Sequence, residues 1–497
     1  MSHEETGNLS DGFAEEPEID AAISSPTVPV LVDSSRPTWQ RVLLLAWPVW
    51  IQQLMLMFVG LYDQFLAGNN PPADEHLHVP FQAAQTTANY LAWFVASCSA
   101  LVSVGSTALV ARFIGGGDRK LAVHTTNQSI VLAFLCGIVA TVAGLLLVGP
   151  VIRMMRLSGP AESMAIDFLV PLLSLVAFQM VEAAGLACLV GAGDTRPTLW
   201  VLGGIAIINV PLAWLCFHGI GPISGLGFPG ITLGTALSHV IGCGAVLLLL
   251  AKGRAGLKLS LREMRPDRAL VRRILRISIP ATLDTISLCV CQLWFVRMVN
   301  DLGVVAAAAH GIAIRWESLG YLSGHAFATA AAALVGQNLG AGRPDRATRS
   351  GWIALGMGLC VMTVMGGIFF VLAPEMFRLL CPTEGQQNVI DAGVPVLRLV
   401  AFAMPPLACI IIFTGALRGA GDTRVPMLLT WIGFLLIRIP LAYLLMFPEV
   451  RLGSLGTLPG ANLGLYGAWL AMTADLFIRG ILYLLRFGLG GWARVRV

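Results

Sequence analysis

The stretch GAGDTRP, at residues 191–197, returns as GAGDTRVP at residues 419–426, 228 positions further along the chain. Taken once, the phrase predicts a turn between two helices, because glycine ends one helix, Asp or Thr caps the next, and proline fits its first turn. Turn chemistry does not explain why the phrase occurs twice. The repeat therefore predicts a chain that is built from two similar halves.

Other landmarks return at nearly the same offset. The pairs are PLLSLVAF (171–178) and PVLRLVAF (395–402), NVPLAWL (209–215) and RIPLAYL (438–444), VARFIGGGDRKLA (110–122) and VGQNLGAGRPDRA (335–347), and the single residues Pro48 and Pro280. A steady offset across separate landmarks indicates duplication. We therefore expect both halves to follow one structural plan.

The composition is that of a membrane protein. Of the 497 residues, 56% are hydrophobic and 12% are charged, whereas roughly a quarter of the residues are charged in soluble proteins. Stretches of about 20 apolar residues can cross a bilayer as helices, and twelve occur, near residues 42–66, 84–112, 122–149, 164–189, 197–217, 230–251, 274–299, 305–337, 347–372, 392–416, 426–447 and 463–486. The sequence predicts an all-α polytopic membrane protein with twelve transmembrane helices in two six-helix lobes.

The even number of spans in each lobe decides how the lobes are related. After six spans the second lobe enters the membrane in the same direction as the first, so the lobes form a parallel internal repeat, a plan of transporters that bind cargo between their halves. The predicted segments are a disordered acidic tail (1–40), an N-terminal lobe (41–251), a basic linker (252–272), a C-terminal lobe (273–487) and a short tail (488–497).

Lys and Arg are concentrated in the two tails and in the even-numbered connections between spans. This distribution predicts that both termini are cytoplasmic, and the first span is expected to direct insertion, since no cleavable signal peptide precedes it. The net charge of +4 then requires no nucleic-acid partner. The basic run at 252–276 is expected to touch anionic lipid. The ten cysteines lack the paired spacing of a metal site, so no metal is expected.

Several motifs together resemble one family of transporters. They are GLYDQFLAG (60–68), LVARFIGGGDRKLA (109–122), NVPLAWLCFHGIGPISGLGFPGITLGTALS (209–238), ALVGQNLGAGRPDRA (333–347) and GALRGAGDTRVPM (415–427). In this order the chain resembles the multidrug and toxic compound extrusion (MATE) family over residues 40–487, and the longest motif is most similar to its bacterial NorM-type branch. The resemblance implies a monomeric secondary transporter of the bacterial inner membrane that uses H+ or Na+ as coupling ion and no cofactor.

A carboxylate deep in a span costs about 2.5–3.5 kcal/mol on insertion scales. Five lie within predicted spans: Asp63, Glu182, Asp284, Glu317 and Asp475. A buried carboxyl group can take up a proton or hold a cation, and the resemblance implies this coupling role for Asp63, because the family's acid of the first span falls at that position. The alternative is a structural acid that is hydrogen-bonded to neighbouring helices.

A second coupling acid is expected at Asp284. The NorM-type branch carries a Glu at the position of Leu288, and Asp284 stands one turn earlier on the same face, as the counterpart of Gln52 in the first lobe. A cleft-lining and a structural role both fit Asp284, and Gln52 is expected to line the cleft. The branch's acid of span ten is also missing. Because sodium prefers several fixed oxygens, as other hard cations do, these losses favour proton coupling.

Three further polar residues are candidates for the cleft. Gln179 and Glu182 lie three residues apart and share a helix face, so they can meet a substrate or their own neighbours. Asn209 matches the Asn that the family keeps in span five, although Ala213 replaces the Asp of some archaeal-type members. We expect Glu317 and Asp475 to be structural, with Asp475 paired to Arg479 on one helix, and His310 and His325 to be packing or polar-contact residues. An adaptable wall for flat organic cations could be formed by Trp93, Phe94, Met180, Trp294 and Met404.

The hypothesis is an antiporter that exports amphiphilic, often cationic, drugs or toxic compounds in exchange for H+ or Na+. Its lobes would alternate in access, with the glycines of the GAGDT loops as hinges. The alternative is a lipid-linked oligosaccharide or lipid flippase of the wider superfamily, for which we expect more spans or a strongly basic cleft. No catalytic motif at usable spacing predicts an enzyme. The expected partners are small organic cations and membrane lipid.

Overall fold

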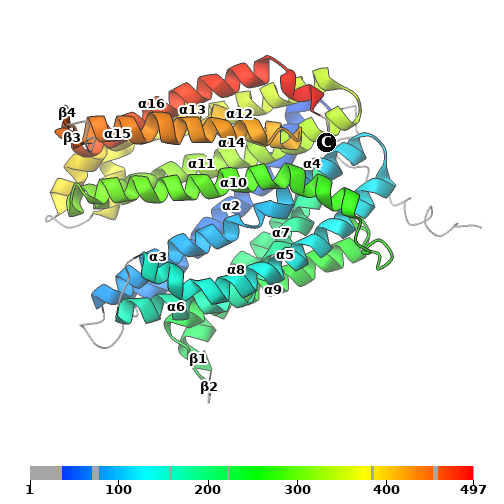
Figure 1. Ribbon diagram of the computed structural model, residues 1–497, viewed down its shortest axis with the longest axis horizontal. Coiled ribbons are helices and arrows are strands. Elements are labelled where there is room, and N and C mark those ends of the chain that lie inside the picture. Colours follow the sequence, from blue (N-terminus) through cyan, green and yellow to red (C-terminus); the bar gives the residue numbers. More distant parts are fainter. Residues whose placement is uncertain are drawn as a thin grey trace, which may run out of the picture.

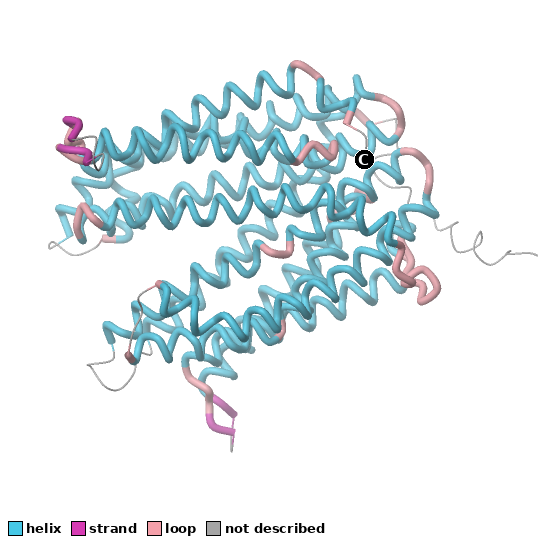
Figure 2. The backbone as a smooth tube through the Cα atoms, in the orientation of Figure 1, coloured by secondary structure: helices cyan, strands magenta, loops and turns pink. Residues whose placement is uncertain are grey.

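A computed structural model describes residues 36–69, 78–155, 159–220, 223–381, 386–451 and 457–495. The described chain is a bundle of long helices with two short antiparallel hairpins at one end, far from the C-terminus (Figure 1, Figure 2). The predicted acidic tail lies outside the described residues as far as residue 35, and the first described helix begins at Thr38. The helical prediction is confirmed.

The first half contains six spans, two of which are built from two helices each. Its helices are α2 (Thr38–Asn69), α3 (His78–Ser97), α4 (Ala100–Gly115), α5 (Arg119–Met154), α6 (Pro160–Ser174), α7 (Val176–Gly191), α8 (Arg196–His218) and α9 (Phe228–Ala251), and the hairpin of β1 (Gly219–Ile220) and β2 (Ile223–Ser224) joins α8 to α9. A short 3-10 helix, Arg254–Gly256, opens the linker to the second half.

The second half repeats this order. Its helices are α10 (Arg268–Asn300), α11 (Val304–Gly340), α12 (Pro344–Leu380), α13 (Gln387–Gly419), α14 (Arg424–Trp431), the π-helix η4 (Ile432–Arg438), α15 (Ile439–Met446), α16 (Gly464–Gly488) and the 3-10 helix η6 (Gly491–Arg494), and β3 (Glu449–Arg451) pairs with β4 (Thr457–Pro459) between α15 and α16. Each hairpin precedes the last span of its half. Among the described residues, eleven spans are long and apolar enough to cross a membrane, and the bent pair α6 and α7 makes a twelfth.

The two copies of one repeated phrase adopt different shapes. The chain bends by 49° between α6 and α7, near Pro171, where Ser174 Oγ donates a hydrogen bond of 2.7 Å to Val170 O. Proline removes a helix hydrogen bond, and a serine that bonds back to its own helix favours bending. The counterpart of Ser174 is Arg398, which lies over the Phe370 ring, and α13 continues unbroken through Pro395.

The first helix of each half begins in the core of the other half. Val42, Leu45 and Val49 of α2 are buried with the apolar residues of α11, α12 and α13, whereas the far end of α2 packs against α3 and α6. In the same way Leu270 and Ile274 of α10 are buried with α4, α5 and α7. Figure 1 shows α2 crossing between the two groups of helices. The starts of α2 and α10 are therefore each buried in the core of the opposite half, and this exchange interlocks the two halves.

The halves meet most closely where α4 crosses α11. Gly115 lies against the backbone of Gln337, and Gly340 lies against the backbone of Arg112, so a Cβ atom at either glycine would overlap the facing helix. Arg112 and Gln337 occupy equivalent positions of the repeat. The halves lie together at this end, which also carries the C-terminus, and diverge toward the hairpins (Figure 1).

The GAGDT loops take part in this contact. Gln337 Nε2 donates a hydrogen bond of 2.7 Å to Gly191 O in the first loop, and Arg112 Nη2 donates one of 3.5 Å to Ala420 O in the second. Each loop thus receives a hydrogen bond from the other half. The two copies of the phrase thus occupy equivalent places in the contact between the halves.

Within each half the loop is also fixed. Gly193 and Gly421 have φ of 88° and 85° and end their helices with left-handed turns. Asp194 pairs with Arg254 at 2.7 Å, and Asp422 pairs with Arg486 at 2.5 Å. The hydrogen bonds and ion pairs favour a fixed joint at this point, in place of the flexible hinge expected from the two glycines.

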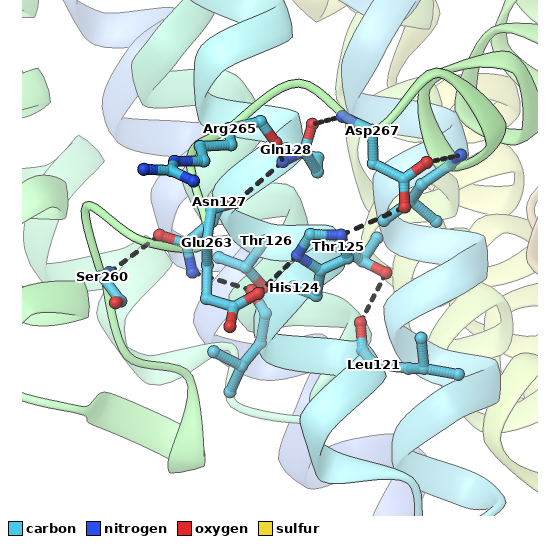
Figure 3. Close-up of polar contacts among 12 residues, drawn as sticks. Leu121, His124, Thr125, Thr126, Asn127, Gln128, Ser260, Glu263, Arg265 and Asp267 are labelled. Atoms are coloured by element: carbon cyan, nitrogen blue, oxygen red, sulfur yellow. Dashed lines mark hydrogen bonds and ion pairs between the residues drawn. The ribbon is translucent and has the colours of Figure 1, made fainter.

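The linker between the halves is docked on the start of α5 (Figure 3). Asn127 donates a hydrogen bond to Lys258 O and accepts one from Ser260 N, both at 2.9 Å. Gln128 donates to Glu263 O and Arg265 O at 2.7 and 2.6 Å and accepts from Asp267 N at 3.0 Å. These contacts use the polar residues at the start of α5. The domain limits at 251 and 272 remain predictions, and α10 begins at Arg268.

Candidate functional site

A polar cluster in the first half joins Asp63 of α2 to Asn209 of α8 and Thr235 of α9. Asn209 Nδ2 donates a hydrogen bond of 2.9 Å to Thr235 Oγ1, and Thr235 Oγ1 lies 3.5 Å from Asp63 Oδ2. Thr235 Oγ1 also lies 3.2 Å from Ile231 O, so its single hydrogen is shared between two acceptors. The consecutive spans α8 and α9 meet the much earlier α2 at this cluster.

Two oxygen atoms of the cluster are buried without a partner. Asp63 Oδ1 and Asn209 Oδ1 accept no hydrogen bond from any described residue, and Asn209 is fully buried. Buried acceptors that lack a donor are costly, and a proton on Asp63 would remove this cost at its own carboxylate. Asp63 is thus a carboxyl group inside the first half with one oxygen that no described residue donates to.

Close helix packing positions this cluster. Gly234, next to Thr235, lies against the backbone of Ala213, where a Cβ atom would overlap α8. The approach of α9 to α8 at this point brings Thr235 to Asn209. Asp63 reaches the same place because the far end of α2 packs against the first half, whereas its start is buried in the core of the second half.

The predicted Glu182 is paired inside the first half. Its Oε2 lies 2.8 Å from Nδ1 of His239, and the side chain is almost fully buried. His239 follows Thr235 by one turn of α9, so Asp63 and Glu182 are bound to successive turns of one helix. Gln179, one turn before Glu182 on α7, is half-buried. Thr235 and His239 were not predicted from the sequence.

The structure separates Asp284 from this cluster. Asp284 Oδ2 accepts a hydrogen bond of 2.7 Å from Arg418 Nη2, which joins α10 to α13 in the second half. A carboxylate that is paired with a guanidinium is already neutralised, so in this conformation its surroundings are those of an ion pair. Gln52 is buried, and its Oε1 has no partner among the described residues.

The predicted pair of Asp475 and Arg479 is confirmed, and Arg438 joins it. Arg479 donates to both carboxylate oxygens at 2.7 and 2.6 Å, and Arg438 Nε donates to Oδ2 at 2.8 Å. All three side chains are buried. Arg438 ends the π-helix η4, where Gly433 leaves room for Asp475 and Arg479. The irregular turn thus accommodates a buried ion cluster.

One face of α11 carries polar and aromatic side chains, and its His325 contacts α2. Glu317, Tyr321 and His325 follow one another by one turn each, and Tyr321 is 41% exposed although α11 packs against helices of both halves. His325 Nδ1 lies 3.3 Å from Gln53 Nε2. The contact of His325 with Gln53 agrees with the expectation of a packing or polar-contact residue, and the structural role expected for Glu317 stays a prediction.

The aromatic and methionine side chains that were expected to form one wall differ in their surroundings. Trp93 and Trp294 are 43% and 46% exposed, and Phe94 is half-buried. Met180 and Met404 are buried in the cores of the first and second halves. The two methionines are therefore packing residues in this conformation, since each is surrounded by core side chains and does not face the space between the halves.

The comparisons with known proteins agree with this architecture. The sequence matches the profile of the MatE family over residues 48–215 and 280–444. The chain is 28% identical over 453 residues to a probable multidrug resistance protein NorM of Thermotoga maritima and 29% identical over 451 residues to a multidrug resistance protein NorM of Burkholderia vietnamiensis, covering 90% of this chain and 92% of the relative in both cases.

Solved structures share the fold. A MATE protein in complex with MaL6 superposes with a TM-score of 0.83, and an outward-facing multidrug resistance MATE family transporter of the MOP superfamily with 0.82. Both are 19% identical, and the matches cover 94% of this chain and 98% of the solved one. The profile spans both halves, and the relatives, which are named as transporters, cover nearly the whole chain. The chain is an integral membrane protein that belongs to the MATE family and is NorM-like.

Proposed function

We propose that the protein is a secondary active antiporter that exports amphiphilic, often cationic, compounds from the cytoplasm in exchange for H+ or Na+. The observation that carries this proposal is the cluster of Asp63, Asn209 and Thr235, with its two buried oxygens that lack donors. The names of the NorM relatives support multidrug efflux. The distribution of Lys and Arg supports cytoplasmic termini, and the bacterial NorM relatives support the bacterial inner membrane as the location.

The cluster favours a proton over sodium. Its side chains offer few oxygens, from Asp63, Asn209 and Thr235, whereas hard cations prefer about six or more fixed oxygen ligands. A proton needs only one carboxylate oxygen. Uptake of the proton would neutralise Asp63, and release would restore a charge that attracts a cationic substrate.

The arrangement of the halves corresponds to one end of a transport cycle. The halves lie together at the end that carries the C-terminus and diverge at the other (Figure 1). If this end is cytoplasmic, the halves lie together on the cytoplasmic side and diverge toward the outside. Protonation of Asp63 would then change the relative stability of this state and its inward-open counterpart.

The flippase alternative receives less support. Lipid phosphate would require a basic surface between the halves, and the buried Arg438 and Arg479 are both engaged by Asp475. Two arginines that hold one carboxylate offer little to a phosphate group. We therefore keep the efflux antiporter as the proposed function.

Proteoliposomes with the wild type and Asp63→Asn test this proposal. A pH gradient and, separately, a sodium gradient are imposed, and movement of a fluorescent organic cation is followed. We expect the pH gradient to drive movement in the wild type, and Asp63→Asn to reduce it at least about tenfold. Asp391→Asn is the matched control, because Asp391 is exposed and, among the described residues, its carboxylate accepts a hydrogen bond from Gln387 of its own helix. If neither gradient moves the dye in the wild type, the efflux proposal is wrong.

A further inference from the structure

A groove runs along the surface of the first half, between α8 and α9. It has a volume of about 400 Å³ and is lined by Trp200, Gly204 and Ile208 of α8, by Ile241 and Leu248 of α9, and by Lys252, which directly follows α9. Trp200 and Leu248 are 75% and 62% exposed. Apart from Lys252, the described lining residues are apolar or aromatic, so the groove suits a hydrocarbon chain.

The packing of the two helices leaves this space open. Near the hairpin that joins them, the helices are in close contact, because Gly234 lies against the backbone of Ala213. Toward their other ends the groove begins, and at Gly204 a Cβ atom would meet no neighbouring atom within 4 Å. Gly204 therefore forms an open floor on which a chain can lie.

The length of the groove is that of one leaflet. The lining residues extend from Ile241 to Lys252 on one side and from Ile208 to Trp200 on the other, which at the rise of an α-helix is about 16 Å and about 12 Å. The hydrocarbon core of a bilayer is about 30 Å thick, so one leaflet contributes about 15 Å. An acyl chain would thus occupy the groove from the interface to the middle of the membrane.

One end of the groove carries a cation. Lys252 follows the last residue of α9, and Trp200 lies near the start of α8, which begins at Arg196. Lysine and tryptophan are typical of the membrane interface. Within the described part of the chain, no ion pair engages Lys252, and the acid at this end, Asp194, is held by Arg254 at 2.7 Å. The ammonium group is therefore available to an anionic headgroup.

The second half does not repeat this cation. The residue that follows α16, the last span of that half, is Leu489. Arg486 in the last turn of α16 is engaged by Asp422 at 2.5 Å. A lysine without an ion pair at the end of the groove is thus a feature of the first half and is not required by the fold.

We propose that the groove between α8 and α9 binds one anionic phospholipid, with an acyl chain between the helices and the headgroup phosphate at Lys252. The chain and the charge both contribute to binding. Free phosphate lacks the chain, and a zwitterionic lipid carries its own cation beside the phosphate. The described lining does not include Asp63, Asn209 or Thr235, so binding can be measured independently of transport.

The full-length purified protein tests the proposal in detergent. It is titrated with dioleoyl phosphatidylglycerol, and native mass spectrometry counts the bound lipid molecules. We expect one molecule to bind with saturation before others attach. Gly204→Leu fills the groove and should weaken half-saturation at least about tenfold, because each buried CH₂ group of the chain contributes to binding. Lys252→Gln removes the cation and should weaken it about fivefold, as expected for one basic residue near an anionic lipid surface.

Matched variants separate the groove from the rest of the surface. Gly244 is an exposed glycine of α9 that also has room for a side chain but lies outside the described lining, so Gly244→Leu should keep the wild-type half-saturation. The same is expected of Lys258→Gln, which removes an exposed lysine of the linker. Lys252→Arg keeps the charge and should retain most of the binding.

Other ligands separate the headgroup from the chain. Dihexanoyl phosphatidylglycerol has the same headgroup on short chains, inorganic phosphate has no chain, and dioleoyl phosphatidylcholine has the same chains without net charge. We expect each of them to bind at least about tenfold more weakly than dioleoyl phosphatidylglycerol. Equal binding of inorganic phosphate would show that the chain has no part in the site.

Two further results would overturn the proposal. One is equal binding of phosphatidylcholine, since Lys252 would then not select the headgroup. The other is equal half-saturation in Gly204→Leu and Gly244→Leu, which would place the lipid elsewhere. If Gly204→Leu does not fold, the comparison of Lys252→Gln with Lys258→Gln decides, because equal half-saturation in these two variants contradicts the site.

Discussion

At the scale of residues, the proposed coupling site depends on one hydroxyl group. Thr235 accepts a hydrogen bond from Asn209 and contacts Asp63, so it connects the two side chains that the sequence identified. Threonine in a span often bonds to its own helix, and Thr235 does so at Ile231 O as well. The sequence around Thr235 does not distinguish it from other threonines in spans. Its role becomes clear only from the packing of α9 on α8.

A substitution at Thr235 tests this connection. Thr235→Val keeps the shape of the side chain but leaves the Asn209 amide without its acceptor and Asp63 without a donor. Hydrogen bonds to charged groups contribute about 1.5–3 kcal/mol, so we expect proton-driven dye movement to fall by about tenfold or more in proteoliposomes. Thr235→Ser keeps the hydroxyl and should retain most activity. Equal activity of the Val and Ser variants would show that the hydroxyl is not needed.

At the scale of elements, the linker is fixed to α5 by an imidazole between two carboxylates. Nδ1 of His124 lies 2.6 Å from Glu263, and Nε2 lies 3.2 Å from Asp267 (Figure 3). His124 thus lies between the two carboxylates and contacts both of them. Asp267 also caps α10 by accepting hydrogen bonds from Ala269 N and Leu270 N at 2.8 and 3.2 Å.

This cap predicts a dependence of stability on pH. The pKa of Asp267 lies below its ordinary value, because Leu270 N–H and the His124 side chain donate hydrogen bonds to its carboxylate. Its contribution is therefore complete above the unfolded pKa of about 3.9 and is lost as the pH falls through the lower folded pKa. We expect Asp267→Ala to lower the unfolding free energy by about 1 kcal/mol at pH 7.

Thermal unfolding in detergent between pH 7 and pH 3 measures this difference. The gap between wild type and Asp267→Ala should narrow at the acidic end. His124→Gln, alone and combined with Asp267→Ala, completes a double-mutant cycle. A gap that stays constant down to pH 3 would contradict the assigned role of the charged carboxylate.

The sequence predicted the elements better than their irregularities. Apolar stretches of sufficient length located the spans because a bilayer imposes one length on all of them. The bend between α6 and α7 was not predictable from proline, since Pro171 and Pro395 occupy the same place in the repeat and only the first lies at a bend. The neighbours of Ser174 and Arg398 decide the difference, and those neighbours are set by tertiary packing.

Only part of the candidate site was predicted from the sequence, because the other contacts also depend on tertiary packing. Asp63 and Asn209 were found because a charge or an amide inside an apolar span is costly and therefore visible in the sequence. The contact of His239 with Glu182 and the ion pair of Asp284 with Arg418 were not predicted from the sequence, because each depends on which helices lie side by side. A single sequence does not contain that information in local form.

At the scale of the whole molecule, reciprocal contacts join the halves. The hydrogen bond from Gln337 to Gly191 O is buried, and a buried hydrogen bond contributes about 1 kcal/mol. Gln337→Ala should therefore increase the population that is open at this end by about fivefold. Distances between spin labels at Lys120 and Asp345 measure the change. Asn338→Ala is the control, because Asn338 bonds to Leu334 O and Ser350 within its own half, and an equal shift in both variants would show that the contact between halves is not responsible.

The exchanged starts of α2 and α10 have a consequence for biosynthesis. α2 is the first described helix to be made, yet Val42, Leu45 and Val49 are buried with residues of α11, α12 and α13. Until α11 and α12 have been made, this surface of α2 lacks its partners in the second half. A chain truncated after α9 would therefore leave that surface of α2 open to lipid or to quality-control proteases.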